Sequence, residues 1–221
     1  MTAADLSHID TWLFDLDNTL YPAETGLGVE ISARITGYVA ELTGLERGSA
    51  QALQKRYLDE YGLTLRGLML HHGVDPDAFH AIFDDLALTA LPRDEALADA
   101  VASLPGRRLI FTNAHEGHVR RVLARLGLAD LFHGVFHIGH ANYAPKPAPE
   151  AFERMTAAFG LRAASTCFFE DRAANLQPAA ALGMTTVLVG LGAEANADPF
   201  VRHRAPRLAP FLAAARVKEP A

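Results

Sequence analysis

The sequence predicts an α/β fold, with a parallel sheet covered by helices and a small all-helical insertion after the first strand. Two observations support this prediction. From residue 92 onward, short apolar β-prone runs alternate with helical patterns, which is the order of crossover units with parallel strands. Residues 23–91, by contrast, contain little β-prone sequence and space their apolar residues as helices do. We therefore expect an α/β core of residues 1–22 and 92–221 and a helical insert of residues 23–91.

The part of the chain before residue 92 is expected to hold one strand and three helices. The strand covers residues 9–14, which are mostly apolar, as in a strand buried on both faces. Asp75 and Pro76 suit the start of the third helix, since Asp caps a helix and Pro is tolerated in its first turn. The helices are expected over residues 29–39, over residues 49–61 and from Asp75 onward, the last with the apolar face Phe79, Ile82, Phe83 and Leu86.

The part after residue 92 is expected to alternate between helix and strand. Helix ends are marked by glycine, as at Gly127 and Gly183. Helices are expected over residues 94–104, 118–126, 150–159 and 173–182, and strands over residues 107–113, 135–138, 166–169 and 185–189. A short edge element and a helix over residues 208–217 complete the expected order.

Composition narrows the classes of function. The chain has 221 residues, half of them hydrophobic, and a net charge of −6 with no basic stripe, which argues against binding a nucleic acid polymer. No run of about 18 apolar residues predicts a membrane span, and no basic segment followed by an apolar one predicts a secretory signal. We therefore expect a cytoplasmic protein. Its one cysteine, Cys167, lies in an apolar run and is expected to be a small buried hydrophobe.

Two carboxylates, Asp15 and Asp17, follow the first strand directly and are joined to Asn18 and Thr19. Two such acids repel each other, and burying them is unfavourable unless a positive charge lies between them. A hard divalent cation, Mg²⁺, meets this need and leaves one carboxylate free to attack phosphorus. The ordinary alternative is a strand that ends in an Asx-type turn.

Further polar residues follow other strands of the expected sheet, and the carboxyl ends of parallel strands share one edge, where ligands bind. Each has an ordinary explanation as a turn hydroxyl, a surface charge or a helix cap. Together, acids for a cation and donors for phosphate oxygens are what phosphoryl transfer requires. The further polar residues are Thr112 and Asn113 after the second core strand, Lys146 before a helix, and Glu170 and Asp171 after another strand.

These four segments resemble, in order and spacing, the motifs of the haloacid dehalogenase-like (HAD) hydrolases, and the resemblance covers essentially the whole chain. The motifs are Asp15-Leu16-Asp17-Asn18-Thr19, Thr112, Lys146-Pro147 and Glu170-Asp171. The family implies a Rossmann-like core, and the insert resembles its C1 cap. Segments such as Leu20-Tyr21-Pro22, Tyr61 to Met69 and Phe168 to Asn175 resemble the pyrimidine 5′-nucleotidase branch, from which Glu170 departs because Asp is more common there.

The resemblance implies roles for the site residues. Asp15 would attack phosphorus to form an aspartyl-phosphate, and Asp17 would protonate the leaving group and then activate water. An acid at position 17 distinguishes phosphatases and phosphomutases from dehalogenating members, whose halide leaving group needs no proton. The resemblance further implies Mg²⁺ on the carboxylates of Asp15 and Asp171 and the main-chain carbonyl of Asp17, phosphoryl oxygens on Thr112, Asn113 and Lys146, and supporting roles for Glu170 and Asn175.

The expected substrate is a small phosphorylated metabolite, first a nucleoside 5′-monophosphate such as UMP or CMP. Alternatives are a sugar phosphate, phosphoglycolate, a phosphomutase reaction, or a phospho-aspartate receiver, although a receiver would lack the cap. Tyr57, Arg66, His71 and His72 are candidate substrate contacts in the cap, but each is expected more often to pack or to face water. The sequence does not predict an oligomeric state.

Overall fold

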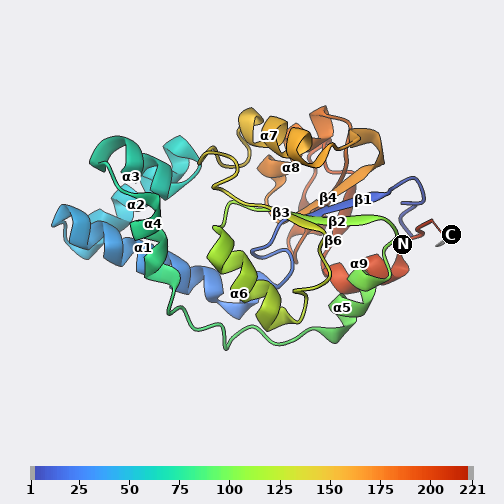
Figure 1. The fold of residues 1–221 in the computed structure, drawn as a ribbon, viewed down its shortest axis with the longest axis horizontal. Helices are drawn as coiled ribbons and strands as arrows, with labels where there is room; N and C mark the ends of the chain where they lie inside the picture. Colours follow the sequence, from blue (N-terminus) through green and yellow to red (C-terminus); the bar gives the residue numbers. More distant parts are fainter. Residues whose placement is uncertain (1–2, 219–221) are drawn as a thin grey trace.

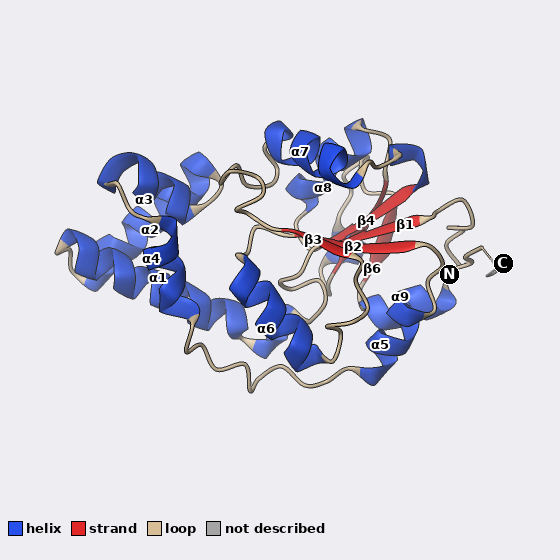
Figure 2. Ribbon diagram, in the orientation of Figure 1, coloured by secondary structure: helices blue, strands red, loops and turns tan. Residues whose placement is uncertain are grey.

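A computed structural model describes residues 3–218 and contains one six-stranded sheet (Figures 1 and 2). The strand order is β3-β2-β1-β4-β5-β6, and every neighbouring pair is parallel, which confirms the predicted fold class. β1 therefore lies in the middle of the sheet, between β2 and β4. The strands are β1 (Thr11–Phe14), β2 (Arg107–Phe111), β3 (Gly134–Phe136), β4 (Thr166–Glu170), β5 (Thr185–Val189) and β6 (His203–Ala205).

Helices cover both faces of this sheet. In Figures 1 and 2, α7 (Pro149–Phe159) and α8 (Ala173–Ala181) lie on one face. On the other face lie α5 (Glu95–Ala102), α6 (Glu116–Leu126) and α9 (Leu208–Ala214). The short 3₁₀ helices η3 (Ala163–Ser165) and η4 (Ala193–Ala195) complete this part of the chain.

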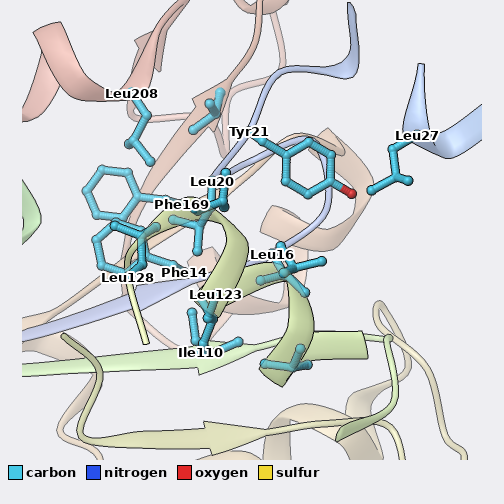
Figure 3. Close-up of a cluster of buried hydrophobic side chains, with 14 of the residues drawn as sticks. Phe14, Leu16, Leu20, Tyr21, Leu27, Ile110, Leu123, Leu128, Phe169 and Leu208 are labelled. Atoms are coloured by element: carbon cyan, nitrogen blue, oxygen red, sulfur yellow. The ribbon is translucent and has the colours of Figure 1, made fainter. Parts of the chain in front are cut away.

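Successive residues of the central strand serve two separate cores, because side chains alternate across a strand. Phe14 packs with Phe169, its ring stacked at 4.7 Å, in the cluster that reaches α6 and α9 (Figure 3). Leu13 belongs instead to the cluster with Phe111 and Phe152, on the side of α7 and α8. Burial on both faces explains why β1 and β4 read as continuous apolar runs in the sequence.

The helical insertion follows β1 and lies beside the sheet domain (Figure 1). The chain enters it through η1 (Ala23–Thr25) and Gly26, and leaves it through residues 84–94, which contain no helix or strand. Its apolar face joins the core cluster, since Leu27 at the start of α1 packs in the group that contains Leu16 and Tyr21 (Figure 3). We call α1 (Leu27–Thr43), α2 (Arg47–Tyr61), α3 (Thr64–His72), α4 (Pro76–His80) and η2 (Ala81–Phe83) the cap.

Several elements differ from the sequence expectation, mostly at their ends. α3 was not expected, because Gly67 in its middle lowers helix propensity. The third expected helix ends at Phe83, before Leu86, and α9 ends at Ala214 instead of residue 217. Cys167 is a buried free thiol, as expected. Within residues 3–218, no helix has the length and apolar character that crossing a membrane requires.

Gly67 is needed where α2 and α3 pack. A Cβ at this position would lie 2.4 Å from Cγ of Tyr57, so any side chain would push the two helices apart. Gly67→Ala is therefore expected to lower the melting temperature, although Gly→Ala in an open helix stabilises by up to about 1 kcal/mol.

The matched control is Gly37→Ala in α1, where a Cβ would have no neighbour within 4 Å. Thermal unfolding followed by circular dichroism measures both variants. Equal or higher stability of Gly67→Ala than of Gly37→Ala would contradict the close packing of α2 on α3.

Candidate active site

Asp15 is the first residue after β1, at the carboxyl edge of the sheet. Its main-chain N–H donates to the carbonyl oxygen of Phe169 at 2.9 Å, which extends the β1–β4 pairing and places Asp15 beside the end of β4. The chain then turns out of the sheet through Asn18, whose φ of 63° is left-handed, a conformation that Asn tolerates better than most residues. Thr19 Oγ1 returns to donate to Asp15 Oδ2 at 3.1 Å.

Lys146 is the positive centre of this edge. Its side chain is 1% exposed, and all three protons of its ammonium group find acceptors. They are Asp15 Oδ1 at 2.7 Å, Glu170 Oε2 at 2.7 Å and the carbonyl oxygen of Phe111 at 2.8 Å. Burial alone lowers the pKa of Lys146, but the charges of Asp15 and Glu170 outweigh it and hold the pKa above its usual value.

Two acids bind this lysine and a third, Asp171, lies beside them, so the site carries more acidic than basic side chains. One carboxylate oxygen from each of Asp15, Glu170 and Asp171 lies within 4.8 Å of the others. Burial, followed by the charge of Glu170, raises the pKa of Asp15 from 3.8 to about 7. Burial also raises the pKa of Glu170 and of Asp171. Carboxyl groups clustered in this way ionise fully only when a further cation is present. Their oxygens are the donor set that a hard divalent ion prefers.

Glu170 and Asp171 differ in their remaining contacts. Both carboxylate oxygens of Glu170 already have donors, Lys146 Nζ on Oε2 and the Arg172 N–H on Oε1 at 3.2 Å. Glu170 thus orients the lysine, whereas Asp171 is the acid better placed to offer oxygen to a cation together with Asp15.

Asp17 is held by two residues that the sequence analysis did not identify. Its Oδ1 accepts from the Tyr21 hydroxyl at 2.5 Å and lies 2.8 Å from His118 Nε2. Burial acts to raise the pKa of Asp17, but the charge of His118 and the hydrogen bonds from His118 and Tyr21 outweigh it, so this pKa lies below the usual value. No sequence spacing marks His118, since it comes from α6, 101 residues further along the chain.

The residues after β2 serve different purposes. Thr112 is buried, and its Oγ1 accepts from the Ala114 N–H at 3.0 Å, which leaves the hydroxyl proton for another acceptor. The Asn113 carboxamide binds the main chain of Lys146 twice, with its Oδ1 accepting from the N–H at 2.8 Å and its Nδ2 donating to the carbonyl at 3.2 Å. In this structure Asn113 therefore fixes the lysine loop. Asn175 is buried, and its Oδ1 has no partner among the described residues.

A cavity of about 300 Å³ lies between the cap and this edge of the sheet. Apolar side chains from α1, α2, α3 and the α4–η2 segment make up most of its wall, and Asp17, His115 and His118 close it on the core side. His80 of α4 stacks on His115 with ring centres 4.4 Å apart, and burial lowers the pKa of both imidazoles to about 4. The lining residues are Asp17, Gly28, Ile31, Ser32, Ile35, Gln54, Leu58, Leu63, Thr64, Leu65, Phe79, His80, Phe83, Asn113, Ala114, His115 and His118.

The four cap residues proposed as substrate contacts do not line this cavity. Tyr57 donates to or accepts from His72 Nε2 at 3.0 Å, and its ring stacks on His71 at 5.3 Å. Tyr57 and the two histidines therefore pack with one another in the α2–α3 hairpin, which agrees with the ordinary explanation given for them. Gln54, Phe79 and Phe83 face the cavity instead.

Comparison with known proteins gives a consistent result. Residues 9–183 match the family described as haloacid dehalogenase-like hydrolase. Phosphate metabolism protein 8 of Saccharomyces cerevisiae (strain ATCC 204508 / S288c) is 28% identical over 193 residues, 80% of this chain and 60% of that protein. Fructose-1-phosphate phosphatase YqaB of Escherichia coli (strain K12) is 34% identical over 97 residues, 43% of this chain and 51% of that protein. The chain thus spans less than two thirds of either protein.

A solved structure shares the fold. The crystal structure of a HAD phosphatase from Thermococcus onnurineus superposes with a TM-score of 0.61 at 18% identity, and the match covers 95% of this chain and all of that one. A parallel sheet with a helical insertion after its first strand is therefore a known arrangement.

The charge balance of the site predicts how a cation affects stability. Because the pKa of Asp15 is about 7 in the folded protein and 3.8 ordinarily, ionising Asp15 disfavours the folded state as pH rises through this window. Mg²⁺ favours the ionised carboxylates, so its stabilising effect is expected to be larger at pH 8 than at pH 5.5. The expected difference is at least about 3 °C in melting temperature, equivalent to roughly 1 kcal/mol.

Thermal unfolding with a chelator and with millimolar Mg²⁺, at both pH values, measures this effect. Asp171→Asn is expected to reduce the Mg²⁺-induced shift strongly, whereas Asp59→Asn, an exposed acid on α2, should leave it as in the wild type. An equal shift at the two pH values would contradict this account of the site.

Proposed function

The chain belongs to the haloacid dehalogenase-like hydrolases and carries their C1-type helical cap, and we propose that it is a Mg²⁺-dependent phosphomonoester hydrolase with Asp15 as its nucleophile. This proposal rests on the contacts and the position of the Asp15 carboxylate. Its Oδ1 is bound by Lys146 and its Oδ2 by Thr19, with Asp171 on one side and the cavity that holds Asp17 on the other.

The residues of this edge divide the reaction between them. A carboxylate oxygen of Asp15 attacks phosphorus, the P–O bond to the leaving group breaks, and Asp17, whose pKa the negative charge of a bound phosphate ester would raise, gives its proton to the departing alkoxide. Asp17 then takes a proton from the water that hydrolyses the aspartyl-phosphate, which frees Asp15 and releases phosphate. Lys146 and the Thr112 hydroxyl would bind the phosphoryl oxygens and offset their charge.

The side chains of Asp15 and Asp171 and the main-chain carbonyl of Asp17 would hold Mg²⁺. When bound, this ion supplies positive charge to the phosphoryl oxygens and favours the ionised form of Asp15. Glu170 would keep Lys146 aligned, and Asn175 would support the same edge. The two contacts of Asn113 to the main chain of Lys146 support a role in positioning this lysine beside the phosphoryl oxygens.

The cavity supports a leaving group without charge. Among the described residues its walls carry no lysine or arginine, the one carboxylate is that of Asp17, and burial favours the neutral forms of His80 and His115. The carboxylate of phosphoglycolate or a second phosphate would have no partner there, which is unfavourable for a buried anion. A volume near 300 Å³ is at the lower end for a ligand site, so the leaving group is a small one.

A nucleoside fits this description, and we propose pyrimidine nucleoside 5′-monophosphates, UMP and CMP, as substrates. Phe79 and Phe83 offer apolar surface for a flat ring. Gln54 donates to Ser32 Oγ at 3.1 Å and accepts from Thr36 Oγ1, which leaves one amide proton and one oxygen lone pair for a ligand. A pyrimidine edge presents both kinds of group. A sugar phosphate is the second candidate, favoured by the similarity to fructose-1-phosphate phosphatase YqaB.

The chain divides into a helical cap and an α/β core. We propose that residues 23–91 act as one cap unit over a core of residues 1–22 and 92–221. The position of α5, which packs against α9, supports placing residues after 92 with the core. The cytoplasmic location stays a prediction from the sequence.

Substitution of the two aspartates tests the mechanism. Asp15→Asn is expected to abolish phosphate release, because an amide is a far weaker nucleophile than a carboxylate. Asp17→Asn should slow release from an alkyl phosphate by roughly 100-fold or more, the usual contribution of acid–base catalysis. Phosphate release under saturating Mg²⁺ is the measurement, with Asp59→Asn as the control. Turnover by Asp15→Asn near the wild-type rate would remove Asp15 as nucleophile.

A panel of phosphate esters tests the substrate class. We expect kcat/KM to be highest for UMP or CMP, lower for ribose 5-phosphate and fructose 1-phosphate, and at least about tenfold lower for 2-phosphoglycolate, whose carboxylate would be buried unpaired. Phosphoglycolate or a bisphosphate as the best substrate would contradict the neutral leaving group. Conversion of a hexose phosphate to its isomer without free phosphate would identify a phosphomutase.

A further inference from the structure

We propose that His118 is a positioning residue for proton transfer, which holds the Asp17 carboxyl group so that its free oxygen meets the leaving group. This inference rests on the proposed function and extends it to a residue outside the four motifs. His118 comes from the first turn of α6, which is anchored beneath the sheet by buried residues such as Val119 and Val122. Asp17 lies on the turn after β1.

The contact pattern at Asp17 is asymmetric. Both donors, Tyr21 and His118, reach Oδ1, while Oδ2 accepts no hydrogen bond from the described residues. With Oδ1 occupied by two donors, a proton carried by this carboxyl group resides on Oδ2. The carboxyl group lines the cavity between cap and core, where the leaving group would lie. The two contacts therefore select which oxygen delivers the proton.

His118 connects Asp17 to a distant element of the core, which Tyr21 does not. Tyr21 is four residues from Asp17 on the same segment, so it moves with the turn that carries both residues. His118 is 101 residues away in a helix of the core, and it connects the turn to that fixed element. Its side chain is 5% exposed, and Asp17 is the hydrogen-bond partner of its Nε2. A misplacement of about 1 Å in such a group can reduce a rate by about 100-fold.

A purely structural histidine would behave differently from a positioning one, and leaving-group chemistry separates the two. An alkoxide such as the 5′-oxygen of a nucleoside is strongly basic and needs a proton as it departs. The p-nitrophenolate ion is weakly basic and departs without one. Loss of the correct Asp17 orientation should therefore harm alkyl phosphates far more than p-nitrophenyl phosphate, whereas general damage to the fold or to phosphate binding should harm both alike.

The experiment compares His118→Leu with His118→Gln in the full chain with Mg²⁺. Leu removes the donor, while Gln places an amide nitrogen close to the position of Nε2. The readout is the ratio of kcat/KM for UMP to kcat/KM for p-nitrophenyl phosphate, which reports the step in which the leaving group departs. We expect His118→Leu to lower this ratio at least tenfold and His118→Gln to restore most of it.

Several outcomes decide the matter. Equal losses on the two substrates in His118→Leu, or no loss on UMP, would overturn the positioning role while leaving the phosphatase intact. If the wild-type protein hydrolyses neither ester, the proposed function and this inference both fail. Should His118→Leu unfold, His118→Asn keeps a polar side chain too short to reach Asp17, and the same ratio is measured on it.

Discussion

The arrangement of this protein depends on one buried ammonium group. Lys146 lies among carboxylates and a main-chain carbonyl that satisfy all three of its protons. A lysine buried to this extent is stable only with such partners, and the acids around it are stable only with its charge. Removing either side would leave unpaired charge in the interior. The ion pair therefore fixes the loop before α7 against the ends of β1, β2 and β4.

Around this centre the site has two sides with different chemistry. On one side, the oxygens of Asp15 and Asp171 gather more negative charge than Lys146 neutralises, which creates the demand for a cation. On the other side, Asp17 faces a mostly apolar cavity and is held by neutral or cationic donors. The proposed nucleophile, Asp15, and the proposed proton donor, Asp17, thus occupy different electrostatic settings two residues apart. Such separation allows one carboxylate to attack while the other exchanges protons.

The cap encloses the cavity beside Asp17 and supplies most of its wall. Its core is continuous with the cluster beneath the sheet, in which Leu27 of α1 lies near Tyr21 (Figure 3), so the same apolar packing holds the cap against the sheet domain. The stacked pair His80 and His115 joins the two parts at the edge of the cavity. Exclusion of water strengthens the electrostatic interactions at Asp15 and would protect the proposed acyl phosphate from premature contact with solvent.

The sequence by itself determined the α/β order, the helical insertion and the meeting of the strand-end residues. These features are local or periodic: apolar runs define strands, and parallel strands bring their carboxyl ends to one edge. These residues were predictable because each lies at or near the end of an element: Asp15 and Asp171 directly follow strands, Glu170 ends β4, and Lys146 lies shortly before α7. Only the tertiary structure decided the partners that come from distant segments. Three features depend on how α6, the loop before α7 and the cap pack against one another. They are the contact of His118 with Asp17, the hydrogen bonds of Asn113 to the main chain of Lys146, and the position of Gln54 in the cavity wall. Likewise, α3 forms despite Gly67, because close packing against Tyr57 compensates for weak helix propensity. Side-chain packing in three dimensions leaves no periodic trace along the chain, so a single sequence does not reveal it.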